Sequence, residues 1–198
     1  LQLMQEKYKN DDFMQKNLPL VFAELDRGNA ILTEYLQSSR VKEMHLAAYD
    51  INDLCNQVLP LYIGPALARG IQIKTDFAAN MQPIMVDGSR FKQILVNMLN
   101  NALAAIETEG QIILKTVEEE DTVCLTVTDT GKGMDEETLA KIGKPFFTTK
   151  EKGTGMGVYN SFSLIKQMQG TVDIQSALGE GTSFIIRFPK LKENMMAI

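Results

Sequence analysis

The sequence predicts an α/β sandwich, with a mixed β-sheet covered by helices on one face, preceded by an all-α helical hairpin. Strand and helix patterns are interleaved after residue 50, and consecutive strands often follow one another as hairpins. The first forty residues instead repeat apolar side chains in alternating steps of four and three, as in a coiled coil or helical bundle. With 198 residues and 44% apolar content, the chain can bury one substantial core and a small second unit.

The N-terminal helices, which we place at residues 1–42, begin partway through a hairpin. The first residues resemble the end of one helix, and the apolar seam of the next helix starts at Met14. Its later members are Leu18, Val21, Leu25, Leu32 and Tyr35. Asp11 or Asp12 is expected to cap this helix, and Pro19 predicts a kink or a late start because proline lacks a backbone donor.

A helical hairpin of this length has too little core to fold alone. Dimerisation into a four-helix bundle would complete it, and packing of the helices on the rest of the chain is the alternative. The polar, unpatterned residues that follow predict a linker at residues 43–49. His45, the single histidine, lies in this linker without a constellation suited to metal binding or catalysis, so we expect a surface residue.

Residues 50–190 are assigned to one α/β domain, and residues 191–198 to a loose tail. Periodicity predicts a first helix from Asp50 to Ala68, and the turn Asp87-Gly88-Ser89 opens a second helix. The second helix is expected at Arg90–Ile106. The other expected elements are strands at Ile71–Phe77 and Ile84–Val86, a hairpin of Ile112–Val117 and Val123–Asp129, helices near Asp135–Lys141 and Gly157–Gln169, and a hairpin of Thr171–Ser176 and Ser183–Pro189.

Composition excludes several classes of protein. The formal charge of -5 argues against a dedicated nucleic-acid binder. The two cysteines, Cys55 and Cys124, lie far apart in apolar runs and indicate small buried residues in a reducing compartment. No apolar run approaches the roughly 20 residues that span a bilayer, and no signal peptide opens the chain. We therefore expect a soluble, cytoplasmic piece of protein.

Two asparagines on the helix predicted at residues 90–106 are the first candidate site residues. Asn97 and Asn101 stand one turn apart and therefore share a face, at the border of the buried apolar stripe. Two carboxamides can coordinate a hard cation and contact phosphate oxygens without adding negative charge. Alone, such pairs are more often simply solvated.

A second candidate follows the strand that ends at Asp129. The run from Asp129 to Gly133 places a carboxylate at the strand end, followed by Gly131 and Gly133. The carboxylate can accept a hydrogen bond from an exocyclic amine such as that of adenine. The glycines would remove side chains so that a flat ring can lie close to the backbone. Taken alone, this run is more often an ordinary turn.

Two glycine-rich segments complete the set. Gly153, Thr154, Gly155, Met156 and Gly157 lead into a helix, where converging backbone N–H groups and the helix dipole favour an anion. No Gly-Lys-Ser/Thr follows, so the segment is not the Walker pattern. No Rossmann unit precedes it, so it is not a dinucleotide-binding motif of that kind either. The turn from Gly179 to Thr182 offers a threonine that can donate to, or accept from, a ring nitrogen or a bridging water.

Together these motifs resemble the ATP-binding superfamily of gyrase, heat-shock chaperone, histidine kinase and MutL-type proteins. Asn97–Ala102 is similar to its N box, and Asp129–Gly133, Gly153–Gly157 and Gly179–Thr182 to its glycine boxes. Pro145–Lys150 resembles the F-box stretch of kinases. The resemblance covers roughly residues 50–189. The preceding helices resemble the second half of a kinase dimerisation and phosphotransfer domain, and sporulation-type sensor kinases are the most similar.

The resemblance implies a pocket for ATP or ADP and Mg²⁺. Asn101 would hold the metal, Asn97 would contact phosphate or metal-bound water, and Asp129 would bind the adenine amino group. Lys150 would be a mobile cation over the phosphates, on a lid between Ile142 and Thr154 that orders around nucleotide. Asn97 and Lys150 are the expected catalytic residues. The full expected nucleotide-binding set is Asn97, Asn101, Asp129, Gly131, Gly133, Ile142, Lys150, Gly153, Thr154, Gly155, Met156, Gly157 and Thr182.

The chain departs from the family pattern in two ways. Many kinases have a lysine or arginine three residues after the second asparagine, where this chain has Ala104. Phosphate charge would then fall mainly on Mg²⁺ and on the lysines of the lid, which are Lys144, Lys150 and Lys152. The phosphoacceptor histidine of the family lies on the first dimerisation helix, upstream of Leu1, and His45 lacks the acidic neighbour of that motif.

The resemblance implies the catalytic part of a two-component sensor histidine kinase. It would transfer the γ-phosphoryl of ATP to the upstream histidine and then to an aspartate of a response-regulator receiver domain. Implied partners are a second copy of the chain, through the N-terminal helices, and an inhibitor protein on the helical bundle. The parent could be anchored in a membrane upstream. The alternatives are an ATPase of the same superfamily, whose hydrolytic members carry glutamate at the position of Asn97, and a non-catalytic module that senses nucleotide.

Overall fold

The computed structural model describes residues 11, 13–14, 16–25, 28, 43–150 and 153–191. The chain divides into two compact units. One comprises Leu1–Lys42 and Pro145–Met156, and the other comprises Glu43–Lys144 and Gly157–Ile198. Each unit is described separately.

In the first unit, the described N-terminal residues 13–14 and 16–25 are helical. Asp11 caps this helix, because its Oδ1 accepts a hydrogen bond of 3.1 Å from the backbone N–H of Met14. The helix begins before Pro19, so the late start that this proline suggested is not seen. Leu32 and Tyr35 of the predicted seam lie outside the described residues, and the hairpin and its dimer stay predictions.

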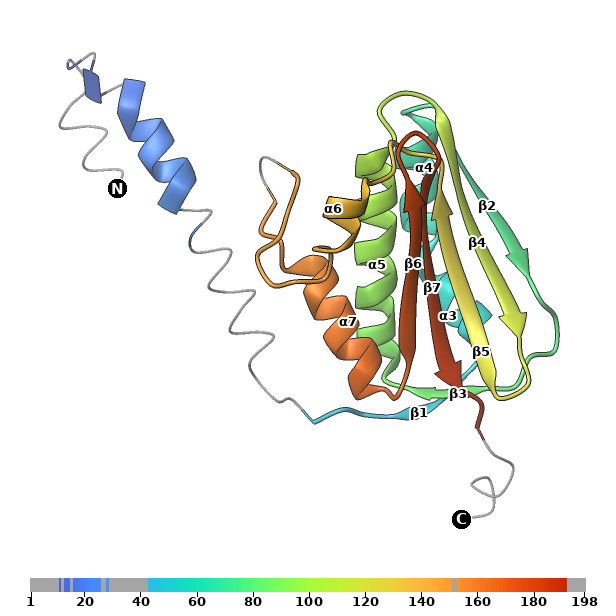
Figure 1. The fold of residues 1–198 in the computed structure, drawn as a ribbon. Coiled ribbons are helices and arrows are strands. Elements are labelled where there is room, and N and C mark those ends of the chain that lie inside the picture. The colour runs from blue at the N-terminus through green and yellow to red at the C-terminus, as the bar shows by residue number, and fades with distance from the viewer. Residues whose placement is uncertain are drawn as a thin grey trace. The chain divides into compact units, whose positions relative to one another are not determined.

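The second unit is built on a mixed sheet in the order β2-β4-β5-β7-β6 (Figure 1). Only the pair β2–β4 is parallel among these neighbours, and the other pairs are antiparallel. A two-stranded sheet, β1-β3, accompanies it. The strands are β1 (Ala47–Tyr49), β2 (Ile71–Phe77), β3 (Ile84–Val86), β4 (Gly110–Glu118), β5 (Thr122–Asp129), β6 (Thr171–Ala177) and β7 (Gly181–Pro189).

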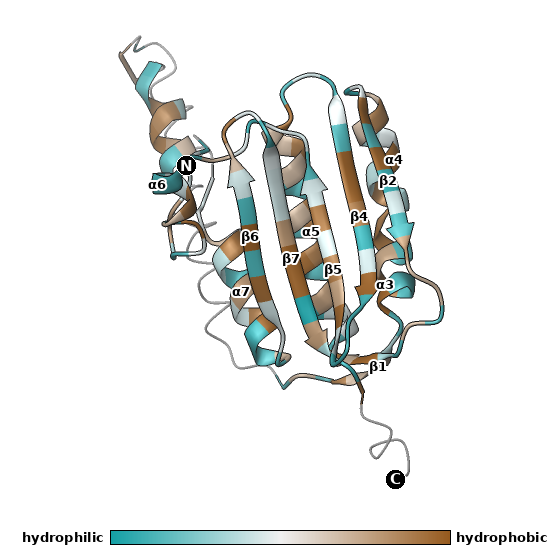
Figure 2. Cartoon of the chain, turned by 45° about the vertical axis from the view of Figure 1, so that its right-hand side comes forward, coloured by the Kyte–Doolittle hydropathy of each residue, from teal (hydrophilic) through white to brown (hydrophobic). Residues whose placement is uncertain are grey.

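Helices of the second unit cover one face of the five-stranded sheet, and Figure 2 views the opposite face. These helices are α3 (Ile51–Val58), α4 (Pro60–Leu67), α5 (Gly88–Ala105), α6 (Glu136–Leu139) and α7 (Gly157–Gln167). The predicted α/β sandwich is therefore confirmed. Among the described residues, no helix combines the length and the apolar character that crossing a membrane requires.

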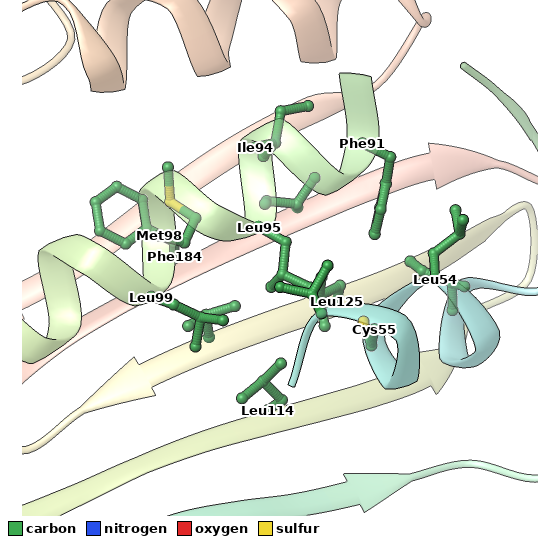
Figure 3. Packing of buried hydrophobic residues seen from close by; sticks show 14 of the residues in the cluster. Leu54, Cys55, Phe91, Ile94, Leu95, Met98, Leu99, Leu114, Leu125 and Phe184 are labelled. Carbon is green, nitrogen blue, oxygen red and sulfur yellow. The ribbon is translucent and has the colours of Figure 1, made fainter. Parts of the chain in front are cut away.

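Helix α5 lies at the centre of the helical layer and carries the expected asparagines. Asp87 caps its start, because Asp87 Oδ1 accepts hydrogen bonds from the N–H groups of Ser89 and Arg90. Leu95 and Leu99 are each at most 1% exposed. Figure 3 shows these two side chains between the helices and the sheet, together with side chains from α3 and from the strands. Because burial of each such leucine contributes about 1.5–3 kcal/mol, this core fixes the position of α5.

Two features differ from the prediction. The helix expected from Asp50 to Ala68 is two helices, which meet at Leu59 and Pro60. Pro60 lacks the N–H that would continue α3, but it suits the first turn of α4. Residues 47–49, expected in the linker, form β1, which pairs with β3. A strand of three mostly exposed residues carries too little alternation to be predicted.

The side chains of the linker and the cysteines lie as expected. His45 is exposed, and its backbone N–H donates to Asp87 Oδ2 at 3.2 Å. Cys55 and Cys124 are free and buried. Burial, together with the charge of Asp50, raises the pKa of the Cys55 thiol to about 12, so this thiol stays protonated at neutral pH.

Candidate functional site

Asn97 of α5 is turned toward α7. Its Nδ2 donates to the carbonyl oxygen of Gly157 at 3.2 Å and to Ser161 Oγ at 3.1 Å. Ser161 in turn donates to the Gly157 carbonyl at 2.9 Å. Because the amide N–H groups serve α7, the side-chain oxygen of Asn97 is the atom that suits a cation or a water proton. The structure thus joins the N-box helix to the start of the helix that follows the second glycine box.

Asn101 is half-buried one turn further along α5. The spacing of four residues places it on the same side of the helix as Asn97, as predicted. Among the described residues, no group of three or more His, Cys, Asp and Glu could hold a metal ion. Asn97 and Asn101 offer amide oxygens on this side of α5, and these are the ligand type that the sequence suggested for a cation.

The second cluster lies where β5 and β7 are paired. Asp129 at the end of β5 is 4% exposed and stands opposite Thr182 of β7. Its Oδ1 accepts a hydrogen bond of 2.8 Å from the N–H of Gly131, and the backbone N–H of Thr182 also favours the charged form of the carboxylate. Burial raises the pKa of Asp129, and the two N–H donors oppose that effect. The carboxylate is thus a buried acceptor held in one orientation.

The glycines around Asp129 serve close packing of the chain on itself. A Cβ at Gly131 would lie 2.6 Å from the carbonyl carbon of Ala105, and the neighbouring Lys132 N–H bonds to the Ala105 oxygen at 3.0 Å. Gly133, with φ +64°, leaves no room for a Cβ beside the Ala177 carbonyl, and Gly181, with φ +93°, leaves none beside the Asp129 carbonyl.

The same packing gives a second reason for glycine at these positions. A Cβ at Gly131 or Gly133 would meet the backbone of the chain itself, and the space that they would leave for a flat ring stays a prediction. Their role in the described structure is to bring the loop after β5 against the end of α5 and the β6–β7 turn. Both clusters are therefore anchored to α5, one at Asn97 and one at Ala105.

Sequence reasoning missed Ser176, although it lies at the centre of the second cluster. Its hydroxyl accepts from the N–H of Met134 at 2.9 Å, donates to the Gly181 carbonyl at 2.8 Å and lies 3.0 Å from Thr182 Oγ1. The available signal was its register, since Ser176 pairs with Thr182 across β6 and β7.

The remaining expected residues divide between the units. Ile142 is half-buried in the second unit. Lys150, Gly153, Thr154, Gly155 and Met156 belong to the first unit, and Lys152 lies outside the described residues. Their roles toward phosphate, and the ordering of the lid, stay predictions.

The described part of residues 145–156 contains several tight local contacts. The Lys150 N–H donates to Thr148 Oγ1 at 3.1 Å. The Gly153 N–H donates to the Lys150 carbonyl, also at 3.1 Å. Gly155 has φ +71°, and a Cβ there would overlap the backbone of Phe146. A larger residue at this position would therefore disturb the segment that carries the expected phosphate donors.

The comparison with protein families gives a match over residues 86–192. The matching model is described as "Histidine kinase-, DNA gyrase B-, and HSP90-like ATPase". The matched range includes α5, α7 and β7. It therefore contains the contacts of Asn97 with Gly157 and Ser161 and the cluster of Asp129, Ser176 and Thr182.

Curated relatives agree with this match. Sporulation kinase A of Bacillus subtilis (strain 168) is 34% identical over 191 residues, covering 96% of this chain and 31% of the relative. Sensor histidine kinase ZraS of Escherichia coli (strain K12) is 34% identical over 166 residues, covering 84% of this chain and 36% of the relative. The chain thus spans about a third of the length of these relatives.

Solved structures share the fold. Full-length ShkA in complex with AMPPNP has a TM-score of 0.73 at 28% identity, covering 82% of this chain and 36% of that chain. Histidine kinase ThkA in complex with response regulator protein TrrA also has a TM-score of 0.73, at 24% identity, covering 96% of this chain and 55% of that chain. The second likeness concerns the fold alone.

Proposed function

We propose that this chain, which belongs to the family of histidine kinase-, DNA gyrase B- and HSP90-like ATPases, is the catalytic part of a sensor histidine kinase. It binds Mg-ATP and transfers the γ-phosphoryl to a histidine on a helix of the dimerisation domain. The observation that carries the proposal is the arrangement of Asp129 and Thr182 at one end of α5 and of Asn97 and Asn101 along the same helix.

Adenine recognition would rest on Asp129. The carboxylate is buried, oriented by the N–H of Gly131, and able to accept a further hydrogen bond from an exocyclic amine. A carbonyl at that position of the base would meet negative charge instead. The site should therefore prefer adenine over guanine nucleotides, with Gly133 and Thr182 as the neighbouring contacts.

The donor set fits a magnesium ion. Asn101 provides an amide oxygen, and the turn of Asn97 toward α7 leaves its oxygen available to a metal-bound water. Mg²⁺ usually keeps several waters and shares few protein ligands with substrate phosphates, so two neutral amides suit it. When bound, the ion would supply charge neutralisation for the phosphates.

Phosphate contacts would come from the second glycine box. Backbone N–H groups at Thr154, Gly155 and Gly157 precede or open α7, where the helix dipole favours an anion. Because Ala104 replaces the basic residue common in kinases, Lys150 and Lys144 would carry the remaining positive charge. Met156, Gly153 and Ile142 would border the nucleotide.

Transfer is favoured over hydrolysis because Asn97 is an amide. Its N–H groups donate to Gly157 and Ser161, and an amide oxygen has no basicity with which to activate a water molecule. Positioning and charge neutralisation would therefore provide most of the catalysis. The second candidate, an ATPase, lacks a described general base at this position.

For the whole protein we propose the partners of a two-component kinase. These are a second copy through the N-terminal helices, a response-regulator receiver domain and an inhibitor protein on the helical bundle, with a membrane anchor upstream in the parent. The sensor histidine kinase among the relatives supports the signalling role.

Calorimetric titration of the chain with ATP, ADP and GTP in the presence of Mg²⁺ tests the binding part of the proposal. We expect clear heats for ATP and ADP and much weaker binding of GTP. Equal affinity for GTP would exclude Asp129 as the adenine acceptor, and absence of binding by all three would exclude the function.

A further inference from the structure

Ser176 is placed to control a neighbouring hydroxyl group. It lies on β6 opposite Thr182 of β7, and Thr182 lies opposite Asp129 of β5. Ser176 is half-buried, whereas Thr182 is 6% exposed. The three side chains therefore form a row across three neighbouring strands, at the end of the sheet where the candidate base site lies.

The hydrogen bonds of Ser176 can be assigned a direction. A serine hydroxyl has one proton to donate and two lone pairs that accept. The Gly181 carbonyl, 2.8 Å away, can only accept, so it takes the serine proton. The Met134 N–H, 2.9 Å away, can only donate, so it occupies one lone pair. One lone pair of Ser176 remains, and it faces Thr182 Oγ1 at 3.0 Å.

Thr182 is then the donor in the contact between the two hydroxyl groups. Its single proton points at Ser176, and its own lone pairs are what it can present to a ligand. Together with the Asp129 carboxylate, the base-facing end of the cluster offers acceptors and no hydroxyl donor. Such an end suits the exocyclic amine of adenine, or a water that donates both to Thr182 and to a ring nitrogen, and disfavours a carbonyl group.

We propose that Ser176 sets the base selectivity of the site by fixing the direction of the Thr182 hydroxyl proton. Ser176 is a positioning residue in this account, because it acts through Thr182 and does not touch the base. The proposal rests on the proposed function, since it requires an adenine nucleotide at Asp129. Its particular consequence is that loss of the Ser176 hydroxyl frees Thr182 to donate to a carbonyl at position 6 of the base.

The test compares the affinities of ATP and ITP in the parent chain and in four variants. ITP has a carbonyl in place of the 6-amino group of ATP and carries a proton on N1. These are Ser176→Ala, Ser176→Thr, Thr182→Val and the double variant Ser176→Ala/Thr182→Val. The ratio of the two affinities is measured within each variant, so a general loss of stability from the unpaired Met134 and Gly181 groups cancels. Ser176→Thr keeps the hydroxyl on a strand-compatible side chain and controls for folding.

Ser176→Ala should reduce the preference for ATP over ITP by about fivefold, the factor that one neutral hydrogen bond contributes. Ser176→Thr should keep the parent ratio. In the Thr182→Val background, Ser176→Ala should change the ratio less than about twofold, because no threonine proton is left to redirect.

Two results would count against the proposal. Equal relaxation by Ser176→Ala with and without the Thr182 hydroxyl would show that Ser176 merely holds the loop, and the proposal would be wrong while ATP binding stands. Failure of the parent chain to bind either nucleotide would overturn the proposed function and this inference with it.

Discussion

Asp129 and Thr182 face each other across β5 and β7, and the backbone N–H of Thr182 favours the charged form of the Asp129 carboxylate. This pairing explains how a carboxylate that is 4% exposed keeps a fixed orientation. Gly181 allows the backbone of β7 to approach the Asp129 carbonyl closely, and Gly131 allows the loop after β5 to pack on Ala105. The base end of the proposed site is therefore part of the sheet itself, and its geometry does not depend on a mobile side chain.

Burial makes the charge of Asp129 costly, and this predicts a pH dependence. The pKa of Asp129 in the folded chain is raised, so the folded state binds its proton more tightly than the unfolded state does. The free energy of unfolding should then fall as pH rises through the interval between the ordinary aspartate pKa and the raised one. Urea denaturation at several pH values should show this fall in the parent and not in Asp129→Asn.

The same variant should lose nucleotide affinity. Asp129→Asn removes the charged acceptor for the adenine amine and should weaken ATP binding at neutral pH by tenfold or more, about 1.4 kcal/mol. Asp173→Asn is the matched control, because Asp173 pairs with Arg187 on an exposed part of the sheet. Unchanged ATP affinity in Asp129→Asn would remove the carboxylate from the site.

Asn101 and its neighbour Asn100 allow a sharp test of the metal site. Asn101→Asp adds charge at the proposed ligand and should disturb Mg²⁺-dependent phosphoryl transfer far more than binding of ADP without metal. Asn100→Asp makes the same change one residue away, at an exposed side chain that accepts from the Tyr62 hydroxyl. Magnesium titrations that overlay for the parent and Asn101→Asp would show that Asn101 is not the ligand.

Gly133 and Gly179 separate backbone strain from steric overlap. Both have positive φ, +64° and +79°, but a Cβ at Gly179 meets open space and a Cβ at Gly133 overlaps the Ala177 carbonyl. Gly179→Ala should lower the free energy of unfolding by about 1–2 kcal/mol, as expected for alanine in a left-handed conformation. Gly133→Ala should cost clearly more and abolish ATP binding. Similar thermal denaturation of the two variants would contradict the packing described around Asp129.

Much of the second unit could be predicted because its signals are local. The helix start at Asp87, the hairpin of β4 and β5 and the end of β5 at Asp129 each depend on residues close in sequence. The break of the first predicted helix also has a local cause, Pro60, whose missing N–H ends α3 although the apolar periodicity continues.

Contacts between distant segments could not be predicted in the same way. The bond from Asn97 to Ser161 joins residues 64 positions apart, and Ser176 contacts Met134 across 42 positions. The overlap that would follow a Cβ at Gly133 depends on the Ala177 carbonyl, which sequence spacing does not place. Residue type therefore indicated the candidate residues, while the hydrogen-bond arrangement around them required the fold.

As the proposed catalytic part of a kinase, this chain should transfer a phosphoryl group and should not hydrolyse ATP. The deciding measurement is to incubate the chain with γ-labelled Mg-ATP, with and without a helical-bundle domain that carries the acceptor histidine and can pair with its N-terminal helices. We predict an acid-labile, base-stable label on the supplied domain and only slow release of phosphate, because Asn97 provides no general base. Sustained phosphate release of the order of several turnovers per second, within the usual enzymatic range, without labelling would contradict the kinase and favour an ATPase.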